Sequence, residues 1–103
     1  MLEKDIVNSI MKHLKSVPTC FAWKEHGGMY GTAGIPDIIA CIGGRFIAFE
    51  VKTKSGKLTK LQENTIRSIK EAKGQAYKVT SLREVKSILE HLEDVPYESS
   101  SAE

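Results

Sequence analysis

The sequence predicts an α/β domain in which a small mixed sheet is flanked by helices, in the order α-β-β-β-α-β-α. Three observations support this fold class. Apolar residues recur at helical spacing near both ends of the chain, the centre holds two runs rich in β-branched and aromatic residues, and a Gly-Gly pair separates those runs. A chain of 103 residues is long enough for one core but not for two. We therefore expect a single domain over residues 1–93.

The first two elements precede a glycine-rich stretch. A helix is expected over residues 3–15, before Pro18 closes the segment, and a short strand over 19–24. Residues 26–34 then hold four glycines, which would let backbone amides approach a phosphate or would serve only as a connector. This stretch lacks the Gly-Lys-Ser/Thr ending of a P-loop, so no nucleotide cofactor is expected.

The central strand-rich segment predicts a hairpin whose loop is Gly43-Gly44, because glycine tolerates the positive φ angles of tight turns. Counting outward from this loop places Asp37 directly opposite Glu50. Opposed residues share a face of the sheet with Cβ atoms roughly 5 Å apart, and Lys52, two residues further along, shares that face. The hairpin therefore groups two carboxylates and one amine.

Two carboxylates placed opposite each other should repel, and a divalent cation between them would remove the repulsion. Mg²⁺ or Mn²⁺ suits such a site because these ions take oxygen ligands and keep positions for water and phosphate. Asp37 and Glu50 would supply ligands together with the backbone carbonyl of Val51. Lys52 would lie beside the metal and act on the attacking water or the phosphate. The group suits metal-assisted phosphodiester hydrolysis.

The remaining elements complete the core. A helix is expected over residues 59–73 with Gly74 placed to end it, followed by a strand over 75–80. A capping box at Ser81-x-x-Glu84 opens a last helix that extends toward residue 92. Residues 94–103 are rich in serine and acids and are expected to form a disordered acidic tail.

The order Pro36-Asp37, twelve residues, then Glu50-Val51-Lys52 resembles the PD-(D/E)xK nucleases. The chain is also similar to their VRR-NUC branch, the virus-type replication and repair nucleases, in its stand-alone viral or phage form. The segments that carry this likeness are Gly34-Ile35-Pro36-Asp37, Glu50-Val51-Lys52-Thr53 and Gly56-Lys57-Leu58-Thr59, with Gln62 following. The resemblance implies a restriction-endonuclease-like core, a Mg²⁺- or Mn²⁺-dependent deoxyribonuclease, and a role in DNA repair.

The resemblance also implies two auxiliary residues, each with a simpler explanation. A glutamate near the start of the first helix lies close to the metal in this family, and Glu3 matches it. An acid in a first turn also complements the helix dipole without any other role. A glutamine at the position of Gln62 faces the active site in the family, but Thr59-x-x-Gln62 is also a capping box. Both interpretations of Gln62 are compatible.

Basic and aromatic residues around the predicted site are candidates for contacts with DNA. Phosphate binding requires such groups, although lysines such as Lys57 and Lys60 are equally expected on an ordinary solvated loop. The candidate contacts are Lys24, His26, Tyr30, Lys54, Lys57 and Lys60.

Composition limits the remaining classes of protein. The formal charge of +2 is only mildly basic, but residues 94–103 carry three acids and no Lys or Arg, so the body is more basic than the whole chain. No apolar span reaches membrane length and no signal peptide is recognisable, so we expect no membrane partner and a location in the cytoplasm. Cys20 and Cys41 are expected to be buried free thiols.

The function predicted is that of a metal-dependent DNA endonuclease selective for branched DNA such as Holliday junctions, since small stand-alone relatives resemble junction resolvases and act as homodimers. Flap or nicking activity is the alternative within the same fold. A catalytically inactive DNA-binding module and a metal-free structural domain are the competing classes. The last of these would require Asp37 and Glu50 to pair with lysines.

Overall fold

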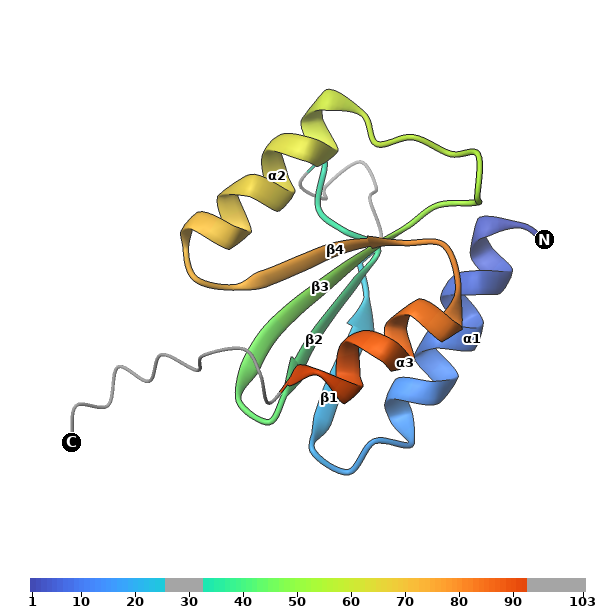
Figure 1. The fold of residues 1–103 in the computed structure, drawn as a ribbon, viewed down its shortest axis with the longest axis vertical. Coiled ribbons are helices and arrows are strands. Elements are labelled where there is room, and N and C mark those ends of the chain that lie inside the picture. The colour runs from blue at the N-terminus through green and yellow to red at the C-terminus, as the bar shows by residue number, and fades with distance from the viewer. Residues whose placement is uncertain (26–32, 93–103) are drawn as a thin grey trace.

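The computed structural model describes residues 1–25 and 33–92 and confirms the predicted order of elements. Within these described residues, three helices and four strands follow one another (Figure 1). Their bounds are α1 Glu3–Lys15, β1 Cys20–Lys24, β2 Ile38–Ile42, β3 Arg45–Val51, α2 Lys60–Glu71, β4 Gln75–Val79 and α3 Leu82–Glu90. No helix in these described ranges is long and apolar enough to cross a membrane.

The four strands form one mixed sheet in the order β1-β2-β3-β4. β1, β2 and β3 pair antiparallel, whereas β3 and β4 are parallel and are joined through α2. The hairpin register is the predicted one: Ile42 pairs with Arg45 across a turn in which Gly43 and Gly44 have φ of 57° and 84°. Both angles are unfavourable for residues with a Cβ, which explains the glycine pair.

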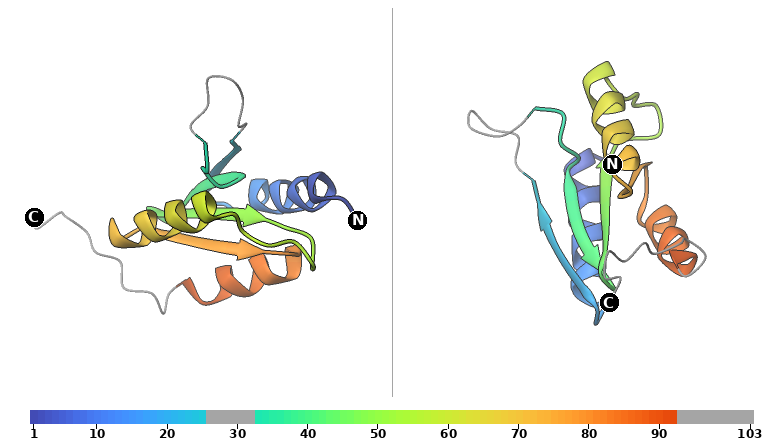
Figure 2. Two further views of the ribbon diagram at one scale, coloured as in Figure 1. Left: turned by 90° about the horizontal axis from the view of Figure 1, so that it is seen from above. Right: turned by 90° about the vertical axis from the view of Figure 1, so that its left-hand side faces the viewer.

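Helices cover the two faces of the sheet unequally. α1 and α3 pack on one face, where the main core joins Ile10 and Leu14 of α1 and Val85 of α3 to Ile47 and Phe49 of β3. Of the described helices, only α2 lies on the other face, where it forms a second cluster of buried residues with the sheet. That cluster contains Ile39, Ala48, Ile66 and Ala76. Figure 2 shows α2 on the side of the sheet away from α1, with β1 at the edge remote from α2.

Both ends of α2 are fixed by local chemistry. At its start Thr59 and Gln62 form the predicted capping box, in which the Thr59 hydroxyl accepts from the Gln62 amide at 3.1 Å. At its end the residue in the left-handed region is Lys73, with φ of 75°, rather than Gly74. Gly74 is needed for space, because a Cβ there would lie 2.9 Å from Cγ2 of Ile69 and 3.0 Å from Cδ1 of Phe46.

The prediction that both cysteines are buried is wrong. Both are free thiols, but Cys41 is exposed and Cys20 only partly buried. The reason lies in the alternation of β2, which points Cys41 to the half of the sheet face that α2 does not cover.

The capping box predicted at the start of α3 also differs from the structure. The Glu84 side chain accepts a hydrogen bond from the Thr80 amide and not from the Ser81 amide. Ser81 still caps α3 by accepting from the Glu84 amide.

Candidate active site

The two predicted carboxylates lie where β2 begins and β3 ends. Asp37 directly precedes β2, and extending the β2–β3 register by one pair past Ile38 and Phe49 places it opposite Glu50. Alternation along the strands turns both side chains toward the face that carries α2. The site is therefore at the end of the sheet opposite the hairpin turn.

The Asp37 and Glu50 side chains lie close enough to share a hydrogen bond when one of them carries a proton. Asp37 also accepts from the backbone amide of Val51, with 2.7 Å between that nitrogen and Oδ2. This bond fixes the Asp37 carboxylate against the end of β3. The predicted use of the Val51 carbonyl as a metal ligand remains a prediction.

Glu50 is only 3% exposed, although it is a carboxylic acid. The pKa of Glu50 is raised from 4.5 to about 8, first by burial and then by the hydrogen bond with Asp37 and the charge of Asp37. The charge of Lys52 acts against this shift, and that of Glu3 adds to it more weakly. Without a cation, the pair therefore holds a proton near neutral pH.

Gln62 performs both of the roles open to it in the sequence. Its Oε1 accepts from the Thr59 amide at 2.9 Å, which completes the capping box. Its Nε2 donates to Oε2 of Glu50 at 3.2 Å. The first turn of α2 is thereby tied to the buried carboxylate, and the cap of the helix orients a site residue.

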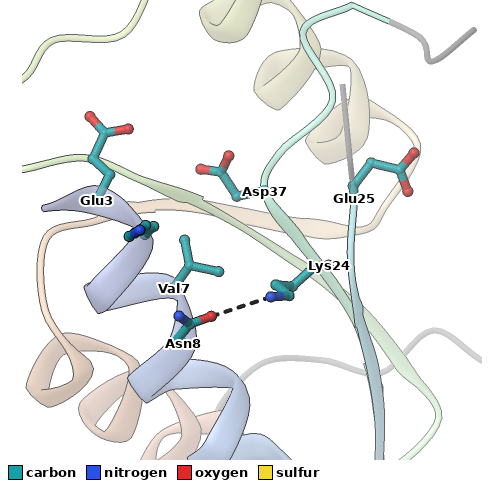
Figure 3. A pocket seen from close by; sticks show the side chains of 7 residues that line it. Glu3, Val7, Asn8, Lys24, Glu25 and Asp37 are labelled. Atoms are coloured by element: carbon teal, nitrogen blue, oxygen red, sulfur yellow. Dashed lines mark hydrogen bonds between the residues drawn. The ribbon is translucent and has the colours of Figure 1, made fainter. Parts of the chain in front are cut away.

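Glu3 lies in the first turn of α1 and lines a pocket of about 280 Å³ together with Asp37 (Figure 3). The capping bond at this helix start belongs to Asp5, which accepts from the Leu2 amide at 3.2 Å, so capping does not explain Glu3. In the described residues no three Asp, Glu, His or Cys side chains converge as a metal site, so Glu3 as a ligand remains a prediction. Glu3 and Gln62 thus place side chains from the first turns of α1 and α2 next to the two carboxylates.

The predicted DNA contacts fall into three groups. Lys54, Lys57 and Lys60 are exposed on and after the segment that leaves β3. Lys24 is exposed at the end of β1, and its Nζ donates to Oδ1 of Asn8 at 3.2 Å. The remaining two candidates, His26 and Tyr30, lie outside the described residues.

Sequence reasoning missed four residues that line the pocket, which are Lys4, Val7, Asn8 and Glu25 (Figure 3). The Glu25 amide donates to the carbonyl oxygen of Asp37 at 2.7 Å, so the β1–β2 register continues to this pair. Its side chain points away from the Asp37 carboxylate and accepts from Nε1 of Trp23 at 3.1 Å. β1 and β2 are not joined by a tight turn whose length fixes the pairing, so the β1–β2 register could not be derived from the sequence.

The donors at the site suit a divalent cation. Asp37 and Glu50 share a hydrogen bond, and Glu50 is buried with a raised pKa. The proton that the pair holds offsets their negative charge, and a bound cation could take its place. The atoms that these two carboxylates offer to a metal are oxygens, the ligand type that Mg²⁺ and Mn²⁺ prefer. Asp37 and Glu50 would hold the ion.

Comparisons with known proteins place this geometry in a family. The sequence profile described as archaeal Holliday junction resolvase (Hjc) matches residues 25–95, a span that contains Asp37, Glu50, Lys52 and Gln62. The chain belongs to the Hjc family. Hjc proteins are PD-(D/E)xK-type nucleases, so the nuclease family predicted from the sequence is confirmed. No curated protein sequence matches the chain.

Two solved structures share the fold of this Hjc-family chain. A "VRR_NUC domain protein" superimposes with a TM-score of 0.77 at 17% identity, covering 100% of this chain and 97% of that one. A "VRR_NUC domain" superimposes with a TM-score of 0.73 at 18% identity, covering 87% and 96%. The predicted VRR-NUC fold, with its mixed sheet flanked by helices, is confirmed. The Hjc family indicates a nuclease with DNA as its substrate.

Proposed function

We propose that this chain is a divalent-metal-dependent endonuclease that cuts branched DNA, with the four-way Holliday junction as its preferred substrate. The observation that carries the proposal is the hydrogen-bonded pair of Asp37 and Glu50, with Glu50 buried and Lys52 near enough to affect its pKa. A structural domain would pair these carboxylates with lysines. Here their hydrogen-bond partners are each other, an amide of Val51 and the side chain of Gln62.

Each residue of the site has a separate role in hydrolysis. A bound divalent cation supplies positive charge that lowers the pKa of water and stabilises charge on the phosphate. Asp37 and Glu50 hold it, and the hydrogen bonds from Val51 and Gln62 keep both carboxylates in place. The Lys52 ammonium orients the attacking water and neutralises charge that develops on the phosphate oxygens.

The choice of branched DNA rests on the family match. The matching profile is described as a Holliday junction resolvase. We further propose that the chain is cytoplasmic and forms a homodimer. Paired cuts on two strands of a symmetric junction require two active sites, which a homodimer supplies.

The alternative activity is flap cutting or nicking by the same site. It uses the same residues and differs only in substrate. A DNA-binding module without catalysis is less well supported, because a buried pair of acids beside the phosphate path would weaken binding unless a cation neutralised it.

The test offers purified protein a labelled four-way junction, a flap, linear duplex and single strand, each with Mg²⁺, Mn²⁺ or EDTA. We expect paired cuts near the junction that require the cation and are lost in Asp37→Asn. Glu63→Gln is the matched control, because Glu63 is an exposed acid next to Gln62 in α2. Cutting of flaps alone would keep the mechanism and discard the junction. Binding without any cutting would replace the proposal with the inactive module.

A further inference from the structure

A tight turn directly follows β3, where the chain leaves the sheet toward α2 (Figure 1). Lys52 comes directly after Val51, the last residue of β3, and its amide donates to the carbonyl oxygen of Val79 at 3.0 Å. The carbonyl oxygen of Thr53 then accepts from the Gly56 amide at 2.9 Å, which closes the turn. The proposed mechanism uses Lys52 but assigns no role to this turn.

Gly56 lies against the stem of Lys52 in that turn. A Cβ added at position 56 would be 3.2 Å from Cβ of Lys52 and 3.3 Å from the carbonyl oxygen of Thr53. Two carbon atoms attract best at roughly 3.5 to 4.0 Å, so the first of these contacts would be too close. Gly56 does not have a positive φ, and backbone conformation therefore does not require glycine there. What requires glycine is the space that the Lys52 side chain occupies.

The position of the Lys52 side chain matters because its amine acts at the carboxylate pair. Burial and Asp37 raise the pKa of Glu50 and the charge of Lys52 opposes them, so the ammonium lies near that carboxyl. Lysine carries its charge on a flexible stem of four carbons, whose direction is set where the stem leaves the backbone. The hydrogen bond to Val79 fixes the backbone of Lys52, and Gly56 limits its Cβ from the side of the turn. The start of the stem is therefore held between β4 and the turn.

The far end of the same segment is also attached to the site. Leu58 packs against the buried cluster beneath α2. Thr59 caps α2 together with Gln62, whose Nε2 donates to Oε2 of Glu50 at 3.2 Å. Residues 53–59 thus run between two residues that both act on Glu50. Because the segment is attached at both ends, an added Cβ in the turn displaces the Lys52 stem as well as the turn.

We propose that Gly56 is a positioning residue for the Lys52 amine: its lack of a side chain lets the turn close on the Lys52 stem and directs the amine to the Asp37–Glu50 pair. This inference rests on the proposed function, because that function gives Lys52 its role in hydrolysis. In this role Gly56 itself contacts neither the cation nor the phosphate. Its contribution to the rate therefore passes through Lys52.

The kinetic test uses the full chain, a labelled four-way junction and Mg²⁺ under single-turnover conditions. Gly56→Ala should lower the cleavage rate constant about tenfold, because small displacements of a catalytic group are costly, and should leave the dissociation constant for the junction unchanged. In a Lys52→Ala background the same substitution should change the residual rate less than about twofold, since the amine that it displaces is absent. Ser55→Ala is the matched control, because Ser55 is an exposed residue of the same turn.

Thermal melting in EDTA tests the contact without relying on activity. Gly56→Ala should lower the melting temperature by about 4 °C through overpacking. Lys52→Ala keeps the Cβ of residue 52, so this loss should be the same in that background. Lys52→Gly removes that Cβ, and the loss caused by Gly56→Ala should there fall to about half or less. The two measurements separate the steric contact from the position of the amine.

Several results would overturn the proposal. A folded Gly56→Ala with the wild-type rate, or an equal loss of rate with and without the Lys52 amine, would show that the turn does not act through Lys52. A weaker affinity for the junction at an unchanged rate would mean that Gly56 instead makes room for the DNA backbone. A melting loss that Lys52→Gly does not reduce would exclude the steric contact. The failure of the proposed function is separable: a wild type that cuts no DNA overturns that function, and the melting series still decides whether Gly56 holds Lys52.

Discussion

Glu50 couples the stability of the metal-free protein to pH. Its pKa is about 8 in the folded protein, against 4.5 in an ordinary environment, with burial as the largest cause. Between these values the folded state binds a proton that the unfolded chain releases. Stability from this group is therefore fully present below pH 4.5 and is lost as the pH rises through about 8.

We predict that in EDTA the wild type loses stability between about pH 5 and pH 8.5 relative to Glu50→Gln, which carries no titrating proton there. Urea denaturation of both proteins at several pH values measures the difference. Added Mg²⁺ or Mn²⁺ should stabilise the wild type most at high pH, because the ion replaces the proton. Parallel profiles for the two proteins would contradict the assignment of the proton to Glu50.

We predict that Lys52 acts on the reaction and not on the fold. Its side chain is only partly buried, and its backbone amide donates to the carbonyl oxygen of Val79 at 3.0 Å, a bond that substitution leaves intact. We predict that Lys52→Ala lowers kcat by about 10²-fold or more, the usual cost of losing charge stabilisation at a developing anion. Affinity for junction DNA should change little.

Lys54→Ala is the matched control for that experiment, since Lys54 is an exposed lysine two residues further along. Single-turnover cleavage at saturating protein, with binding measured separately, distinguishes the two variants. Equal losses of kcat in both would mean that Lys52 contributes only general attraction for phosphate.

At the scale of elements, α2 and the segment before β2 are in close contact. Gly34 has φ of 84°, and a Cβ added there would lie 2.7 Å from Cγ of Leu61 and 2.9 Å from Oγ1 of Thr65. Leu61 precedes Gln62, which holds Glu50. The approach of the two segments thus sets the position of a residue in the site.

We predict that Gly34→Ala lowers the free energy of unfolding by about 3 kcal/mol, from backbone strain plus overpacking. Gly43→Ala is the control, because Gly43 also has positive φ but nothing lies within 4 Å of its added Cβ. It should cost only about 1 kcal/mol, from strain alone. Adding Leu61→Ala should recover part of the stability that Gly34→Ala removes, and no recovery would contradict the steric explanation.

The same elements show why part of the site was predictable. A two-residue loop leaves no freedom in counting, so the pairing of Asp37 with Glu50 followed from Gly43-Gly44. Short-range capping chemistry likewise predicted the bond between Thr59 and Gln62. In these cases the controlling interaction is local in sequence.

Other features depended on packing that a sequence does not display. The stretch 26–34 separates β1 from β2 in the sequence and is too long to fix their register. The pairing of Glu25 with Asp37 therefore could not be derived. The burial of Cys41 was mispredicted because the sequence of this strand does not show which part of the sheet α2 covers. Whether a helix reaches a given row of a sheet depends on tertiary packing, which leaves no periodic signal in the strand itself.

At the scale of the whole molecule, the two ends of the sheet differ in charge chemistry. The carboxylate pair lies at one end, and Lys54, Lys57 and Lys60 are exposed on the segment that follows β3 there. At the other end, Lys86 lines a pocket that includes Gly43 of the hairpin turn. If DNA approaches only the carboxylate end, these two sets of lysines must contribute differently to binding.

We predict that replacing Lys54, Lys57 and Lys60 by Gln weakens binding to junction, flap and duplex alike, because ion pairs with phosphate carry no structural preference. The slope of log affinity against log salt should become shallower by about 1 for each phosphate that a lysine no longer neutralises. Lys86→Gln should leave affinity and slope unchanged, as measured by fluorescence anisotropy over a salt series. If Lys86→Gln lowered affinity and slope as much, DNA would also contact the hairpin end of the sheet. Its path would then extend over α3, beyond the carboxylate site.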